Sequence, residues 1–100
     1  MADAKRVTQL TSFLQNVKEN HLLGFVCNLS ELCRLLRWRV TDAKNILLGS
    51  DEMISEFTEK PNRQMWLTEK GTKWILLKAP IRASTYNALL TVYPTLFQAQ

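Results

Sequence analysis

A chain of 100 residues is long enough for one domain with a single hydrophobic core. Hydrophobic residues make up 46% of the chain and charged residues 22%, close to the globular average, which argues against intrinsic disorder. No apolar run approaches the roughly 18 residues of a membrane helix, and the N-terminal residues lack the apolar core of a secretion signal. We therefore expect a cytoplasmic protein without membrane contact.

Residue types needed for catalysis or metal binding are scarce. His21 is the only histidine, and the two cysteines, Cys27 and Cys33, stand among apolar residues. A zinc site needs further Cys or His ligands at suitable spacing, and the three glycines form no phosphate-binding loop. We therefore predict no catalytic residues, no metal site and no cofactor, and interpret both cysteines as small core residues.

The formal charge of +4 is unevenly distributed along the chain. Residues 34–44 hold four basic residues and one acidic residue, and residues 60–82 hold six basic residues and one acidic residue. Between them, residues 51–59 hold four acidic residues and no basic one. This distribution would allow a polyanion to contact two basic segments that lie on separate structural elements. The alternative is that these charges form ordinary solvated faces.

Apolar spacing predicts two helices in the first part of the chain. A helix over residues 4–19 follows from the amphipathic stripe of Val7, Leu10, Phe13, Leu14 and Val17. A brief strand is expected in the apolar run LLGFVC, residues 22–27. Asn28 and Glu31 then form a capping box, which predicts that a second helix begins there and ends near Trp38.

A third, short helix is predicted after the second one. Thr41 is a suitable N-cap, and Asp42 is favourable in the first helical turn. Gly49 and Ser50 end this helix early. Its inward residues are predicted to be Ala43, Ile46 and Leu47.

Alternating residues then predict a β-hairpin followed by a helix. The strands are expected at 53–58 (MISEFT) and 64–68 (QMWLT), with a turn at 59–63 (EKPNR). Thr68 caps the following helix, which ends before Pro80. Its apolar stripe is predicted to be Trp74, Ile75 and Leu77. We expect Trp66 and Trp74 in the core, the alternative being exposed aromatics that stack on bases; the position of Trp38 stays open.

A last helix is predicted over residues 81–93 and is closed by Pro94. An apolar stripe on one side of it must be covered by something. We predict that the stripe forms a homodimer interface; the alternative is that it folds back on the first helix as core. The stripe consists of Tyr86, Leu89, Leu90 and Tyr93.

This order of elements resembles the winged-helix variant of the helix-turn-helix. The resemblance covers residues 7–79 and depends on LSELCRLLRW (29–38), VTDAKNILL (40–48), the two hairpin strands and LTEKG (67–71). LTEKG is similar to the segment that follows the wing in MarR-type repressors, and fimbrial-operon regulators have a similar layout. The resemblance implies an α+β fold in one domain, residues 1–100, with a three-helix core, a two- to three-stranded β-wing and additional C-terminal helices.

The resemblance also implies a DNA-binding surface. The third helix would enter the major groove, with Lys44 and Asn45 at base edges and Arg39 and Thr41 at phosphate. The acidic segment 51–59 would weaken phosphate contacts of the wing unless it points away. The remaining candidates are the wing tip, Lys60, Asn62 and Arg63, and two backbone-gripping residues, Arg34 and Arg37.

These observations favour a small sequence-specific DNA-binding protein that regulates transcription, with double-stranded DNA as its partner. The alternative is a winged-helix module that binds a protein through the acidic wing strand or the last helix and never contacts nucleic acid. An enzyme ranks third, because no nucleophile, base or metal constellation is visible.

Overall fold

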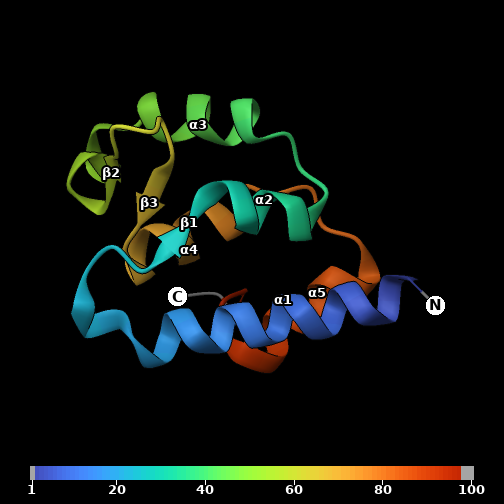
Figure 1. The fold of residues 1–100 in the computed structure, drawn as a ribbon. Helices are drawn as coiled ribbons and strands as arrows, with labels where there is room; N and C mark the ends of the chain where they lie inside the picture. The colour runs from blue at the N-terminus through green and yellow to red at the C-terminus, as the bar shows by residue number, and fades with distance from the viewer. Residues whose placement is uncertain (1, 98–100) are drawn as a thin grey trace.

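The computed structural model describes residues 2–97, and its helices and strands form an α+β arrangement, which confirms the predicted class (Figure 1). The three strands form one small antiparallel sheet in the order β1-β3-β2. The elements are α1 (Ala2–Glu19), the 3-10 helix η1 (His21–Leu23), β1 (Cys27–Asn28), α2 (Leu29–Leu36), α3 (Val40–Leu48), the 3-10 helix η2 (Asp51–Glu56), β2 (Phe57–Glu59), β3 (Met65–Leu67), α4 (Glu69–Leu76) and α5 (Ala83–Val92).

Helices α1 and α5 pack along each other and form one side of the molecule (Figure 1). The α1 stripe is confirmed: Leu10, Leu14 and Val17 are buried, and Val7 and Phe13 pack against the same core. The Lys18 ammonium donates to the carbonyl of Val92, 3.3 Å away, and joins the ends of the two helices. The last helix therefore folds back on the first, as the alternative interpretation had it.

This packing determines which residues of α5 a second copy of the chain could contact. Leu89 is fully buried and Tyr93 is 7% exposed, both within the core of the single chain. Of the stripe predicted for a dimer interface, Tyr86 is exposed and Leu90 is half-buried. Tyr86 also stacks on Phe97, with ring centroids 5.0 Å apart. Leu89 and Tyr93 are thus buried within the single chain and are not exposed for a second copy to contact.

Helix α2 begins and ends on local signals. The Asn28 side chain accepts from the backbone N–H of Glu31 at 3.1 Å, which confirms the predicted cap. Arg37 adopts a left-handed conformation with φ 56° and closes the helix. Because α2 stops at Leu36, Trp38 lies in the following turn, where it packs half-buried against the core.

Helix α3 starts two residues earlier than predicted. Its N-cap is Arg39, whose carbonyl accepts from the amides of Asp42 and Ala43. The prediction that Thr41 caps α3 is therefore wrong, because the helix already begins at Val40 and Thr41 lies within it. Ala43 and Leu47 are buried as predicted, and the third expected inward residue, Ile46, is half-buried.

The hairpin is confirmed, but its first strand is shorter than predicted. β2 pairs with β3 through Phe57 opposite Leu67 and Glu59 opposite Met65. Residues 51–56 form the 3-10 helix η2 instead of a strand. The opposite strand turns into α4 after Thr68, whose amide bonds the Glu56 carbonyl, so residues 51–55 have no strand to pair with. Of the early strand predicted at 22–27, only Cys27 lies in β1, and Leu22 and Leu23 belong to the 3-10 helix η1.

Helix α4 is capped by Thr68 as predicted, since its hydroxyl accepts from the Gly71 amide at 3.1 Å. A Cβ on Gly71 would lie 2.8 Å from the backbone oxygen of Glu56, which explains the glycine of LTEKG. Leu77 was predicted to be buried, but it is 46% exposed because the helix ends at Leu76. The residues that α4 buries are Gly71, Thr72, Ile75 and Leu76.

Candidate nucleic-acid interface

Helix α3 presents one side to solvent. It lies along the edge of the molecule farthest from α1 (Figure 1), and only Ala43 and Leu47 are fully buried. Thr41, Asn45 and Leu48 are exposed, and Arg39 is exposed at its start. The two polar side chains and the arginine are therefore available to an external ligand.

The tip of the hairpin is a tight turn with a defined geometry. The Arg63 amide donates to the Lys60 carbonyl at 2.8 Å, and the Lys60 amide donates to the Gln64 carbonyl at 2.9 Å. Arg63 has φ 65°, the left-handed position of a three-residue hairpin loop. The Asn62 side chain accepts from the Gln64 amide at 3.1 Å. The turn therefore holds Arg63 in a fixed and exposed position.

Lys44 joins this tip to α3. Its ammonium donates to the carbonyl of Arg63 at 3.2 Å and lies 3.3 Å from the carboxylate of Glu59. The Lys44 side chain is 26% exposed, against 54% for Glu59. Lys44 was predicted to read bases, but its charge is engaged within the chain. Its structural effect is to bring Arg63 and Asn62 beside α3.

Three of the four acidic residues in the 51–59 segment have partners on other elements. The Glu52 carboxylate accepts from the Trp74 indole N–H at 3.2 Å. The Glu56 carboxylate accepts from the Thr68 hydroxyl at 2.7 Å, and this bond, followed by one from Ser55, lowers the pKa of Glu56 below its usual value. With Glu59 paired to Lys44, three of these carboxylates are held by the fold.

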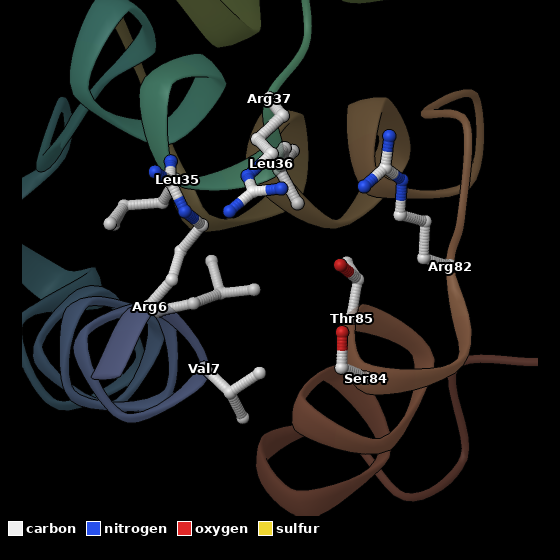
Figure 2. A pocket seen from close by; sticks show the side chains of 9 residues that line it. Arg6, Val7, Leu35, Leu36, Arg37, Arg82, Ser84 and Thr85 are labelled. Atoms are coloured by element: carbon white, nitrogen blue, oxygen red, sulfur yellow. The ribbon is translucent and has the colours of Figure 1, made fainter. Parts of the chain in front are cut away.

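Two of the predicted DNA contacts lie elsewhere. Arg34 lines a groove beside α1, and its carbonyl accepts from Arg6 at 2.8 Å. Arg37 extends from the α2–α3 turn toward α1 and α5, away from α3 (Figure 2). The structure therefore does not bring Arg34 and Arg37 to the surface formed by α3 and the hairpin.

Trp66 lies outside the core, contrary to the prediction. Met65 and Leu67 are buried, and Trp66 points to the opposite face of the sheet because side chains alternate along a strand. The Lys60 ammonium lies 4.5 Å from the centroid of its ring, a cation–π distance. The indole N–H of Trp66 is buried and has no hydrogen-bond partner among the described residues. Lys60 is therefore directed toward Trp66, on the side of the sheet away from the core.

Sequence reasoning missed two arginines. Arg6 and Arg82 line a pocket together with Arg37, although they are distant in the sequence (Figure 2). No spacing rule could bring them together, because their proximity depends on α5 packing along α1. The exposed apolar residues Leu22 and Leu23, in the 3-10 helix η1, were also not predicted to be at the surface.

Within residues 4–97, whose side chains the structure describes, no group of three His, Cys, Asp or Glu could hold a metal ion. No helix in that range is both long enough and apolar enough to cross a membrane. Comparison with known protein families, with characterised proteins and with solved structures finds no match for this chain.

Proposed function

We propose that this protein is a winged-helix DNA-binding protein that regulates transcription. The order α1, β1, α2, α3, β2, β3 and α4 is compatible with that fold. The observation that carries the proposal is the contact of Lys44 with Arg63 and Glu59, because it unites α3 and the hairpin tip in one surface. A helix and a wing held side by side can contact the major groove and the neighbouring backbone together.

The basic, amide and hydroxyl side chains of this surface have separate roles in the proposed complex. Asn45 reads base edges in the major groove, since an amide pairs bidentately with adenine. Arg39 and Thr41, at the start of α3, hold phosphate and fix the register of the helix. The wing tip, with Lys60, Asn62 and Arg63, contacts the backbone or the minor groove. Lys44 acts as a positioning residue for the wing.

Fluorescence anisotropy with labelled duplexes tests this proposal through two variants. Arg63→Gln removes a phosphate contact, so it lowers affinity for all sequences and reduces the log–log salt slope by about 1. Asn45→Ala lowers discrimination between duplexes at an unchanged salt slope. Lys70→Gln is the control, because Lys70 is exposed and belongs to α4. Unchanged affinity in both test variants would refute the proposed surface.

A second candidate is a protein-interaction module, favoured by one apolar patch. Leu22 is 87% exposed and Leu23 is 78% exposed, and Phe25 beside them is 41% exposed. Adjacent exposed apolar residues often mark a protein contact. A double variant, Leu22→Ser with Leu23→Ser, distinguishes the candidates: DNA affinity is retained if α3 and the wing are the binding surface.

A further inference from the structure

One face of α3 carries an exposed leucine beside polar residues. Leu48, in the last turn of α3, is 62% exposed, and Thr41 and Asn45 are exposed on the same helix. A helix turns by about 100° per residue, so these three side chains fall within an arc of about 60°. We call them the outer face of α3. Helix α3 lies at the edge of the molecule, so its outer face is open to a large ligand (Figure 1).

The outer face is poorly suited to recognising guanine. In the major groove guanine is read mainly by Arg or Lys, whose N–H groups pair with its O6 and N7 atoms. Within Val40–Leu48, all of which the structure describes, the one basic residue is Lys44. The Arg63 carbonyl and the Glu59 carboxylate hold its ammonium. The outer face therefore offers an amide and an alkyl group to the bases, and no basic group.

The amide of Asn45 and the alkyl group of Leu48 both match the major-groove edge of A·T pairs. An Asn amide pairs bidentately with the N6 and N7 atoms of adenine. Thymine presents an apolar group there, its 5-methyl group, on which apolar side chains pack. Asn45 and Leu48 lie about 4.5 Å apart along the helix axis, close to the separation of about 3.4 Å between neighbouring base pairs. The two side chains can therefore reach neighbouring pairs.

Asp42 is also exposed on α3, and a carboxylate can accept a hydrogen bond from the N4 amine of cytosine. Asp42 lies about 120° from Leu48 around the helix axis. It is on the side of Asn45 away from Lys44, which contacts the hairpin. Its negative charge also opposes the approach of phosphates. Recognition by Asp42 would give a preference for G·C pairs, the opposite of the preference that Asn45 and Leu48 give.

We propose that α3 recognises neighbouring A·T pairs, with Asn45 paired to an adenine and Leu48 packed on the 5-methyl group of a thymine. This inference rests on the proposed DNA binding by α3 and the wing, and it names the bases that this surface selects. Leu48 then determines specificity without adding affinity for the backbone, because its side chain carries no charge and makes no phosphate contact.

Replacement of thymine by uracil tests the Leu48 contact, because uracil lacks only the 5-methyl group. Fluorescence anisotropy at low salt gives the Kd of three duplexes of equal length: A·T pairs in mixed order, the same duplex with uracil for every thymine, and G·C pairs. The A·T duplex should bind most tightly. Uracil should raise its Kd by about fourfold, the effect of one methyl group withdrawn from water. The uracil comparison is needed because the narrow minor groove of A·T pairs also attracts basic side chains.

Two variants assign the methyl contact to one side chain. In Leu48→Ala the thymine and uracil duplexes should bind with nearly equal Kd, because the side chain that packs on the methyl group is gone. Ile54→Ala is the matched control: Ile54 is also 62% exposed but belongs to η2. This control should retain the wild-type difference between the two duplexes. Far-UV circular dichroism checks that both variants are folded.

The outcomes separate this inference from the proposed function. Equal Kd for the thymine and uracil duplexes in the wild-type chain, with an affinity that falls as salt rises, would refute the Leu48 contact and leave DNA binding standing. Tighter binding of the G·C duplex, or an undiminished uracil effect in Leu48→Ala, would refute the contact in the same way. If none of the duplexes binds at low salt, the proposed DNA binding fails, and this inference fails with it.

Discussion

The ammonium of Lys44 donates a hydrogen bond to the backbone carbonyl of Arg63, 3.2 Å away, and so ties the middle of α3 to the tip of the hairpin. Glu59, at the end of β2, holds the same ammonium at 3.3 Å. A hairpin of three-residue strands has little stability of its own. The position of the hairpin relative to α3 therefore depends on a few contacts, and the Lys44 contact is the one that holds the hairpin tip.

Lys44→Met should loosen the hairpin tip without unfolding the chain. We expect faster hydrogen exchange at the Arg63 and Lys60 amides, because the contact that holds the tip against α3 is lost. Since Glu59 is half exposed, the free energy of unfolding should fall by less than about 1 kcal/mol. Hydrogen exchange followed by NMR measures both the exchange rates at the tip and the free energy of unfolding, with Lys70→Met as the control. Unchanged exchange at the tip would show that Lys44 does not hold it.

Gly71→Ala should destabilise the fold. The new Cβ would lie 2.8 Å from the backbone oxygen of Glu56, which cannot move without disturbing the bond that it accepts from the Thr68 amide. We expect a loss of about 1–3 kcal/mol, typical of overpacking. Urea unfolding measures it, with Lys70→Ala as the exposed control in the same helix. Helix propensity alone predicts the opposite sign, a gain of about 1 kcal/mol, so a stabilised variant would contradict this account.

Features with local causes were predictable from the sequence. The caps at Asn28 and Thr68 depend on side chains that bond amides three residues away, and the α1 stripe depends on helical spacing alone. The first part of the strand expected at 53–58 is a 3-10 helix for a long-range reason, because the opposite strand turns into α4 after Thr68. Alternation of residue types cannot show where a ladder partner ends.

The candidate site was predictable in part, for the same reason. The tip residues Asn62 and Arg63 follow from the turn sequence, and their exposure is a local property. The engagement of Lys44 is not local, because it requires the hairpin to lie beside α3. The pocket of Arg6 and Arg82 requires α5 to return along α1, which no pattern within either helix encodes.

Stability should depend on pH through Glu56. The hydrogen bonds from Thr68 and Ser55 lower the pKa of Glu56 in the folded chain below its usual value of 4.5. Because the pKa of Glu56 is lower in the folded chain than in the unfolded chain, its ionised carboxylate stabilises the fold above pH 4.5. This stabilisation is lost as the pH falls through the pKa of the folded chain. Urea unfolding between about pH 6 and about pH 3 measures this loss.

Thr68→Val serves as the matched variant for this pH dependence. The loss of stability on acidification should be smaller in the variant, because its Glu56 lacks the main bond to the carboxylate. At neutral pH the variant should also be less stable by about 1 kcal/mol, from the lost helix cap. An identical pH dependence in both proteins would show that another carboxylate is responsible.

Neither cysteine should react with thiol reagents in the folded protein. Burial raises the pKa of Cys27 to about 12 and that of Cys33 to about 11, so the reactive thiolate is scarce at neutral pH. Both are also buried in the core. A coloured disulfide reagent should label two thiols only after urea is added. Rapid labelling of the native chain would contradict the burial of these residues.

The most direct test of the central claim is an NMR titration of the ¹⁵N-labelled chain with a pool of DNA duplexes at low and high salt. Binding by α3 and the wing predicts shifts at residues 39–48 and 60–63, with an affinity that falls steeply as salt rises, by a slope of about −0.9 per neutralised phosphate. The absence of shifts at low salt, or shifts confined to residues 22–25 or 86–97, would contradict it.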